Sequence, residues 1–347
     1  MMRDHRAMTL PSDMLAIAIT APGGPEVLAT QRVPIPTLGA QDVLIRVAAA
    51  GVNGPDLAQR RGQYDPPPGA SPILGLEVAG EIVACGPEVT GFKPGDRVMA
   101  LCNGGGYAEY VAVPFGQVLP ISPDWSFAEA ASLPETWFTV TQTLVMRAGL
   151  GAGMTVLVHG AAGGIGSAAL QISTILGAKP IGVVSQAEKV EHCKALGAVA
   201  VINRLTENIA ERVMDITGGK GVDRVVDLVG GDMAAINIAA SARGGHIVQV
   251  STLEGSTASV PLRQMMARDL TLSGSTLRPQ SAATKAAIAS RIRNDLLPTL
   301  FGPSGKRPTI TTFTLEKAAD AHATMESRRH VGKLILLTAF GAGESPT

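Results

Sequence analysis

One short segment limits the possible folds of this chain more than any other. An apolar run, Thr155–His159, leads through a stretch of small residues into the apolar-periodic segment Ile165–Leu176. In the pattern G-x-G-x-x-G, the first position makes a tight turn, the second lets the backbone approach a pyrophosphate, and the third packs helix against strand. We therefore predict a dinucleotide site here; the alternative is a turn that only connects a strand to a helix. Ala161, Gly163 and Gly166 take the three glycine positions, and the predicted binding residues are Ala161, Ala162, Gly163, Gly164, Ile165 and Gly166.

Apolar runs continue to alternate with amphipathic segments after this turn. This alternation predicts an α/β fold with a doubly wound parallel sheet. Residues 14–137 instead contain short apolar runs separated by Gly and Pro, and this β-rich texture returns after Pro308. We predict a flexible extension over residues 1–13, a β-rich domain from residues 14–137 and 308–347, and a cofactor domain over residues 138–307.

The end of the second predicted strand, Pro180–Val184, discriminates between nicotinamide cofactors. A carboxylate at this place would bind the ribose 2′-hydroxyl of NAD. The chain has Ser185 there, and no acidic residue occurs before Glu188. Together with Lys189 and Arg204, Ser185 favours the 2′-phosphate of NADPH; individually, each of the three could be an ordinary surface residue.

Composition excludes several classes of function. Lys plus Arg and Asp plus Glu are both 29, and aromatic residues are 3% of the 347, which argues against nucleic-acid and membrane-surface partners. No apolar run is long enough for a membrane span or a signal peptide, so we expect a cytoplasmic protein without membrane contact. Neither a G-x-S-x-G elbow nor a Walker loop occurs, which disfavours hydrolases and ATPases.

Two further segments carry a resemblance to a known family. Gly75–Gly80 and Gly91–Val98 resemble the catalytic-domain signature of the medium-chain dehydrogenase/reductase superfamily, and Ala161–Gly166 is similar to the loop of its quinone oxidoreductase branch. The resemblance extends from Met14 to about Leu337. More narrowly, Gly62–Ser71 and Pro134–Trp137 resemble the p53-inducible quinone oxidoreductase subgroup.

This resemblance implies a GroES-like catalytic domain beside a Rossmann domain, with the active site in the cleft between them. It also implies hydride transfer from NADPH to a small-molecule quinone or a related conjugated carbonyl. Members are usually homodimers, paired through an edge strand of the Rossmann sheet, and sometimes tetramers.

The resemblance also bears on zinc. Zinc-dependent members have Cys at the position of Asn53 and His at the position of Leu76, and their third ligand, near Thr136, is missing here as well. The chain has three scattered cysteines, too few for a four-cysteine zinc lobe. A catalytic zinc ion needs three protein ligands, so we predict no metal site.

Most of the remaining candidate site residues match family positions, whereas Ser251 and Thr252 are candidates because they end a predicted strand, where ligands of parallel sheets bind. The resemblance implies that Asn53 orients the substrate or the nicotinamide and that the Tyr64 hydroxyl binds the acceptor oxygen. The alternatives are an Asn that bonds its own loop and a Tyr that packs against the Pro66–Pro68 loop. Six other polar residues are expected near the cofactor: Thr139, Ser251, Thr252, Ser275, Thr276 and Lys333. The alternative role of each is capping or turn formation. His192, His322 and His330, on expected helices, are predicted to be solvated.

Two other functions stay open at this stage. One is an enoyl-thioester or enone reductase of the same superfamily, which would use the same hydride on a carbon–carbon double bond. The other is a non-catalytic, crystallin-like structural protein that binds NADPH without turnover.

Overall fold

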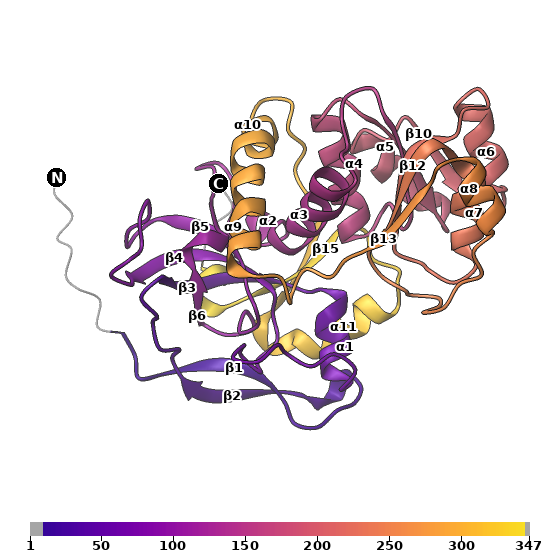
Figure 1. The fold of residues 1–347 in the computed structure, drawn as a ribbon. Coiled ribbons are helices and arrows are strands. Elements are labelled where there is room, and N and C mark those ends of the chain that lie inside the picture. The colour runs from indigo at the N-terminus through magenta and orange to yellow at the C-terminus, as the bar shows by residue number, and fades with distance from the viewer. Residues whose placement is uncertain (1–9, 344–347) are drawn as a thin grey trace. The chain divides into compact units, whose positions relative to one another are not determined.

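The computed structural model describes residues 10–343 and divides them into two compact units (Figure 1). Unit 1 contains the described residues up to Glu135, the segment Ser281–Ala289, and the described residues from Pro308 onward. Unit 2 contains Thr136–Gln280 and Ser290–Arg307. The predicted domain boundaries lie within two residues of this division, except that Ser281–Ala289 groups with unit 1. Of the predicted extension, residues 1–9 lie outside the described part, and Asp13 begins the first strand.

Unit 1 is β-rich, as expected from its Gly- and Pro-punctuated apolar runs. A seven-stranded sheet has the order β14-β15-β3-β4-β5-β7, with β6 paired to β3, and β1 pairs with β2 in a separate two-stranded sheet. The strands are β1 (Asp13–Ile19), β2 (Leu28–Pro34), β3 (Asp42–Gly51), β4 (Glu77–Cys85), β5 (Arg97–Leu101), β6 (Tyr110–Pro114), β7 (Val118–Pro120), β14 (Ile310–Thr314) and β15 (Lys333–Leu337). The helices are α1 (Gly54–Arg60), α2 (Phe127–Ala130), α11 (Ala318–Glu326) and α12 (Ala339–Ala342), with 3-10 turns at Pro25–Val27, Phe115–Gln117 and Leu315–Lys317.

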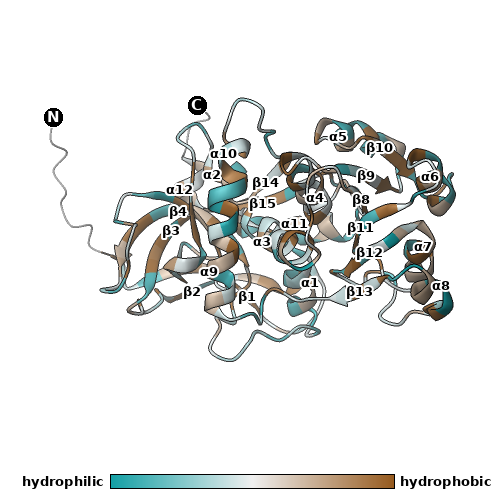
Figure 2. Cartoon of the chain, turned by 45° about the horizontal axis from the view of Figure 1, so that its top comes forward, coloured by the Kyte–Doolittle hydropathy of each residue, from teal (hydrophilic) through white to brown (hydrophobic). Residues whose placement is uncertain are grey.

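The C-terminal segment of unit 1 returns to its N-terminal elements. β15 pairs antiparallel with β3, with Leu336 opposite Ala50, and α11 lies beside α1 in both ribbon views (Figures 1 and 2). Buried residues from strands far apart in sequence, such as Val47, Val78 and Leu334, form one core. This packing ties the segment after Pro308 to the first half of the chain.

Unit 2 contains a six-stranded sheet of the order β10-β9-β8-β11-β12-β13, in which all neighbouring strands are parallel. Its strands are β8 (Thr155–Val158), β9 (Lys179–Val184), β10 (Ala200–Asn203), β11 (Val222–Asp227), β12 (Ser241–Gln249) and β13 (Thr271–Gly274). Its helices are α4 (Gly164–Ile175), α5 (Val190–Ala195), α6 (Ile209–Ile216), α7 (Met233–Ala240), α8 (Leu262–Ala267) and α10 (Leu297–Leu300), with a 3-10 turn at Ala187–Lys189. The α/β fold with a parallel sheet is therefore confirmed.

Two helices contain residues of both units. α3 (Pro134–Val140) continues as a π-helix over Thr141–Arg147, and α9 (Ala282–Arg291) is followed by a second π-helix, Ile292–Leu296.

Strands of both sheets carry hydrophobic residues (Figure 2). In unit 2, Leu157, Ile181 and Val225 lie in the core. Among residues 10–343, no helix combines the length and the apolar character that a membrane crossing needs.

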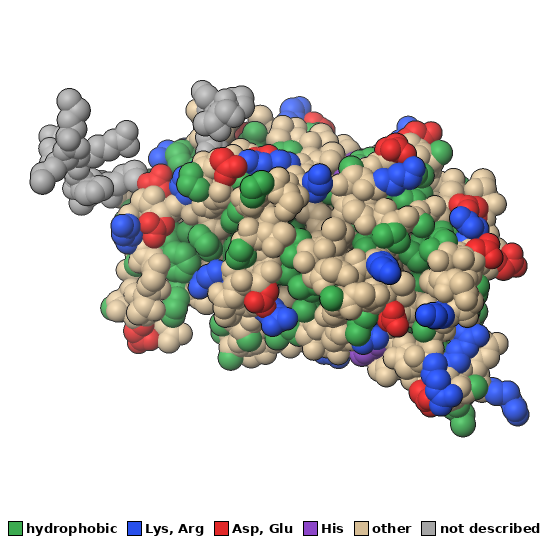
Figure 3. All heavy atoms as spheres, turned by 90° about the horizontal axis from the view of Figure 1, so that it is seen from above, with side chains coloured by type: hydrophobic (Ala, Val, Ile, Leu, Met, Phe, Trp, Pro, Cys, Tyr) green, Lys and Arg blue, Asp and Glu red, His purple; other side chains and the backbone are tan. Residues whose placement is uncertain are grey.

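On the face drawn in Figure 3, basic and acidic side chains mostly lie close to one another, with hydrophobic side chains between them. This distribution agrees with the equal numbers of basic and acidic residues in the sequence.

Candidate functional site

The carboxyl ends of the unit 2 strands bring most of the predicted cofactor residues to one edge. Because all six strands are parallel, the segments that follow them leave the sheet on the same side. Going across the sheet, this edge carries Arg204 after β10, Ser185 after β9, the Gly160–Gly166 turn after β8, Ser251 after β12 and Ser275 after β13. The central strand β8 has β9 on one side and β11 on the other, so the chain direction across the sheet reverses at β8. Ligands of open α/β sheets bind at such a reversal.

The turn after β8 has the geometry that a phosphate site needs. Gly160 has φ +58° and makes the turn one residue before the position predicted for it, Ala161. Gly163 is the N-cap of the 12-residue helix α4, with no side-chain cap. The first N–H groups of a helix have no partner within it, and they attract anions.

The third position of the pattern is filled for a packing reason. A Cβ atom at Gly166 would lie 2.3 Å from the Gly160 carbonyl oxygen and 2.5 Å from the Ala161 Cα atom. Only glycine therefore lets α4 approach the turn. At Gly163, by contrast, a Cβ atom would meet nothing closer than 3.4 Å. A Cβ atom at Gly163 would therefore meet no close neighbour, which leaves the helix N-terminus open on that side, as the binding of a pyrophosphate requires.

A second observation fits a bound cofactor. The hydroxyl oxygen of Ser275 is buried and has no hydrogen-bond partner within residues 10–343. Buried polar groups are normally satisfied, so a hydroxyl group without a partner at this edge is available to a bound ligand. Thr276 beside it is exposed.

Three polar residues lie at the edge formed by β9 and β10. Ser185 and Lys189 are partly exposed, and partial burial lowers the pKa of Lys189. The backbone N–H of Arg204 donates to the Val184 carbonyl oxygen over 2.9 Å, which places Arg204 against the end of β9. The Arg204 guanidinium group forms an ion pair with Glu254, with the nearest atoms 2.9 Å apart. The sequence interpretation did not include Glu254.

The other predicted cofactor residues have local contacts. The carbonyl oxygen of Ser251 accepts a bond from the Gln249 side chain over 2.6 Å, and Thr252 is exposed. Thr139 is buried in α3, where its carbonyl oxygen accepts a bond from the Thr143 hydroxyl group. Lys333 does not join this edge, because it begins β15 in unit 1.

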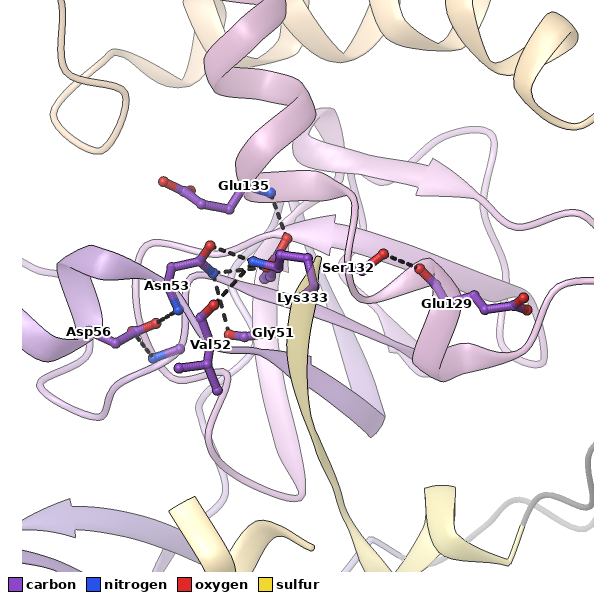
Figure 4. A network of polar contacts seen from close by, with 10 residues as sticks. Gly51, Val52, Asn53, Asp56, Glu129, Ser132, Glu135 and Lys333 are labelled. Atoms are coloured by element: carbon purple, nitrogen blue, oxygen red, sulfur yellow. Dashed lines mark hydrogen bonds and ion pairs between the residues drawn. The ribbon is translucent and has the colours of Figure 1, made fainter. Parts of the chain in front are cut away.

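In unit 1, Lys333 lies beside Asn53 (Figure 4). Both belong to a buried polar cluster that also contains Glu77. The Lys333 ammonium group lies 2.5 Å from a Glu77 carboxylate oxygen, 2.6 Å from the Asn53 amide oxygen and 3.2 Å from the Val52 carbonyl oxygen. A lysine has three donors, so this set uses all of them. Asn53 in turn donates to Glu77 over 2.8 Å and to the Gly51 carbonyl oxygen over 3.4 Å. Both amide hydrogens of Asn53 are used in these bonds, so Asn53 could donate to a substrate only by exchanging one of them, while its amide oxygen keeps a second acceptor lone pair.

Two further carboxyl groups border this cluster, and the sequence interpretation did not select them. Asp56 is buried and accepts the backbone N–H groups of Asn53 and Gly75, each over 2.9 Å, while burial raises its pKa to about 6. Glu135 is partly exposed, and its N–H donates to Glu77. Desolvation, followed by repulsion from Glu77, raises the pKa of the Glu135 carboxyl group to about 8. The raised pKa favours the protonated form of the Glu135 carboxyl group near neutral pH.

The three positions where zinc-dependent relatives have ligands are visible in the same unit and at its boundary. Asn53 is held by Lys333, Leu76 is 1% exposed in the apolar interior, and Thr136 is buried in α3. Across the described residues, no group of three or more His, Cys, Asp or Glu side chains could hold a metal ion.

Two side chains differ in how well the sequence anticipated them. Tyr64 is partly exposed and follows α1, on the Pro-rich loop where it was expected. His322, predicted to be solvated, is instead fully buried: its ring nitrogens contact Arg60 over 3.2 Å and the Tyr107 hydroxyl group over 3.0 Å. Burial, together with the nearby Arg60 charge, lowers the pKa of His322 to about 3. The prediction was wrong because the helical period did not reveal that α11 packs beside α1.

Comparison with known proteins adds independent findings. Residues 39–123 match the family model "Alcohol dehydrogenase GroES-like domain", and residues 164–290 match "Zinc-binding dehydrogenase". The pig (Sus scrofa) protein named quinone oxidoreductase is 32% identical over 333 residues, which cover 93% of this chain and 98% of that protein.

Solved structures agree. The chain is similar to Escherichia coli quinone oxidoreductase, crystallised with NADPH, with a TM-score of 0.81 and 29% identity over 93% of this chain and 99% of that one. It is also similar to the CurK enoyl reductase, with a TM-score of 0.83 and 26% identity over 94% and 99% of the two chains. The narrower resemblance to the p53-inducible subgroup remains a prediction.

Proposed function

Because this chain belongs to the quinone oxidoreductase branch of the medium-chain dehydrogenase/reductase superfamily, we propose that it is an NADPH-dependent quinone reductase that works without zinc. The chain has the nicotinamide-cofactor-binding fold of this superfamily and is one of its oxidoreductases. The observation that carries the cofactor half of the proposal is the open helix N-terminus at Gly163. The acceptor half is supported by relatives that are named quinone oxidoreductases.

The residues at the carboxyl edge of the unit 2 sheet would hold NADPH. The Ala161–Gly166 turn would bind the pyrophosphate. The Ser275 hydroxyl group, which has no hydrogen-bond partner among the described residues, would bind the nicotinamide end of the cofactor. Bound NADPH supplies the hydride that reduces the acceptor. Lys333 would act indirectly, by fixing Asn53, because its donors are used within unit 1.

The preference for NADPH over NADH is supported by the end of β9. The segment directly after β9 contains no carboxylate before Glu188 to bind a ribose 2′-hydroxyl group, and a carboxylate at its start would repel a 2′-phosphate. Ser185 can donate a hydrogen bond to a phosphate, and Lys189 and Arg204 contribute positive charge.

Zinc independence is supported by the contacts of Asn53. The place of the first zinc ligand is occupied by an amide that is bonded to the Lys333 ammonium group, and a cation there repels a second cation. Leu76 offers no ligand atom. The match named "Zinc-binding dehydrogenase" covers residues 164–290, which contain neither Asn53, Leu76 nor Thr136.

Reduction of a quinone also requires protons, and Glu135 is suited to supply one. The raised pKa of its carboxyl group favours the protonated form near neutral pH, and its side chain is partly exposed. Tyr64, whose side chain is also partly exposed, is proposed to bind the acceptor oxygen through its hydroxyl group. The acceptor is a quinone or a related conjugated carbonyl compound.

A second candidate is an enoyl or enone reductase, because a structure of that name is about equally similar to this chain. The TM-score with the CurK enoyl reductase is 0.83, against 0.81 for the E. coli quinone oxidoreductase. The same hydride donor and the same acid at Glu135 would serve a carbon–carbon double bond. The two candidates differ only in the acceptor.

We further propose that the protein forms homodimers through the edge strand β13. This strand has a neighbour on one side only, and Leu272 on it is 37% exposed. On α8, Leu262 and Met266 are 66% and 77% exposed, and their four-residue spacing places them on one helix face. Exposed apolar side chains and an unpaired strand edge are both features suited to an interface. Tetramers and the cytoplasmic location remain predictions.

Oxidation of NADPH by the purified protein tests the proposed function. The loss of NADPH absorbance would be followed with 1,2-naphthoquinone, 1,4-benzoquinone, an alkenal and crotonyl-CoA, and each series would be repeated with NADH. We expect turnover of the quinones, with NADPH preferred. Turnover of crotonyl-CoA alone would favour the second candidate, and NADPH binding without turnover of any acceptor would favour a non-catalytic, crystallin-like role.

A further inference from the structure

The ion pair between Arg204 and Glu254 joins two loops from different parts of the unit 2 sheet. Arg204 donates its backbone N–H to the Val184 carbonyl oxygen at the end of β9. Glu254 donates its backbone N–H to the Val229 carbonyl oxygen, just after β11, also over 2.9 Å. The side chains then meet through two contacts, of 2.9 and 3.4 Å. Each side chain is therefore anchored at its own strand end.

The strand order places this pair across the carboxyl end of β8. In the sheet, β8 lies between β9 and β11, so the two anchors are two strand spacings apart, or about 10 Å. The positive charge of Arg204 also contributes to lowering the pKa of His159, the residue that follows β8, although burial is the larger cause. The pair thus spans the edge beside the Gly160–Gly166 turn, where a dinucleotide would have to enter.

We propose that Glu254 is a specificity-determining residue: its carboxylate competes with the 2′-phosphate of the cofactor for Arg204. This inference rests on the proposed function, since it assumes that a nicotinamide dinucleotide binds at this edge. A dinucleotide that enters must separate the pair, whichever cofactor it is. NADPH then supplies a 2′-phosphate that replaces the Glu254 carboxylate on Arg204, whereas NADH supplies no anion in its place.

The size of the effect follows from exposure. The side chains of Arg204 and Glu254 are 31% and 39% exposed, so their ion pair should contribute the free energy that is usual for a partly exposed pair. Such a pair corresponds to about a two- to five-fold change in an equilibrium constant. A charge-assisted hydrogen bond from Arg204 to a phosphate is stronger and corresponds to about ten-fold or more.

Binding measurements on a double-mutant cycle test the inference. Dissociation constants of NADPH and NADH would be measured by titration calorimetry for the wild type, Glu254→Gln, Arg204→Gln and the double variant. Glu254→Gln should tighten NADPH by about two- to five-fold, and Arg204→Gln should weaken it by about ten-fold or more. NADH should be tightened about equally by either substitution, with no further gain in the double variant, because each alone already removes the pair.

A matched control separates this effect from a general change of charge. Asp269 forms an ion pair with Arg243 over 2.6 Å, and it lies just before β13, at the opposite edge of the sheet. Asp269→Asn also removes one negative charge, and Asn tolerates the positive φ of 53° at this position. It should leave both dissociation constants unchanged. Thermal melting without nucleotide would verify that every variant is folded.

The outcomes separate the two proposals. If the wild type binds NADPH and Glu254→Gln changes neither dissociation constant, or changes them no more than Asp269→Asn does, the inference is wrong and the proposed function stands. If additive gains for NADH appear in the double variant, the two residues act independently and the inference is also wrong. If the folded wild type binds neither dinucleotide, the proposed function fails first.

Discussion

The two glycines at the start of α4 should respond to alanine in different ways. At Gly166, the new Cβ atom would lie 2.3 Å from the Gly160 carbonyl oxygen and 2.5 Å from the Ala161 Cα atom, and both are backbone atoms that cannot rotate away. At Gly163, the nearest atom would be 3.4 Å away, and the backbone angles of −85° and 179° are open to any residue. Gly166→Ala therefore disturbs packing, whereas Gly163→Ala only fills the space proposed for the pyrophosphate.

The magnitudes follow from these contacts. To restore ordinary contact at residue 166, the turn and the helix must separate by about 1 Å, and overpacking of this kind costs about 1–3 kcal/mol. For a unit of this size, each kcal/mol lowers Tm by roughly 2–4 °C. Gly163→Ala should change the free energy of unfolding by less than about 0.5 kcal/mol. If its methyl group displaces the pyrophosphate from the helix N-terminus, NADPH binding should weaken by about ten-fold or more.

Thermal melting and NADPH titration calorimetry on the same three proteins check this prediction. We expect Gly166→Ala to lower both Tm and affinity, and Gly163→Ala to lower affinity alone. Gly163→Ala with the wild-type melting temperature and the wild-type NADPH affinity would refute the reasoning, because the cofactor would then not approach this backbone.

Four further predictions concern unit 1 and the proposed dimer. Lys333→Met leaves the buried Glu77 carboxylate without its cation and should lower the free energy of unfolding by about 3–5 kcal/mol in urea titrations; a loss below about 1 kcal/mol would show that Glu77 finds another partner. Desolvation and Glu77 raise the pKa of Glu135 from 4.5 to about 8, so the folded protein binds the extra proton between those values and stability should fall as pH rises through this window. In Glu135→Gln this part of the fall should disappear from pH-dependent melts, and an identical pH profile would contradict the assignment. Met266→Asp should shift the protein from dimer to monomer in sedimentation velocity. If the wild type itself sediments as a monomer, the proposed β13 interface is wrong. Tyr64→Phe should lower kcat/KM for quinones without changing NADPH affinity; unchanged kinetics would remove Tyr64 from the site.

Much of the fold was predictable because its strands carry strong local signals. The predicted runs Thr155–His159 and Pro180–Val184 lie within one residue of β8 and β9 at both ends, and the segment Ile165–Leu176 lies within one residue of α4. β2 was not anticipated because its residues are mostly exposed and lack an apolar alternation. α1 was not anticipated either, since three of its four buried residues are polar or charged: Asp56, Gln59 and Arg60.

The candidate site could be predicted only where its residues follow one another in a short segment or at the end of a strand. The turn before α4 and the polar strand ends follow from spacing alone, because parallel strands bring their carboxyl ends together. Glu77, Glu135 and Glu254 could not be selected in this way. Their roles depend on partners far away in sequence, such as Lys333 for Glu77 and Arg204 for Glu254. A carboxylate without a visible partner resembles any surface residue until the fold supplies the contact.

The most direct test of the account is quinone reduction by protein that contains no metal. After dialysis against a chelator and verification of metal content by mass spectrometry, kcat/KM for 1,2-naphthoquinone would be measured with NADPH, with and without added zinc. The account predicts full activity in the metal-free protein and no gain from zinc. Activity that is lost on dialysis and restored by zinc would contradict it, because Lys333 and Asn53 would then not take the place of the metal.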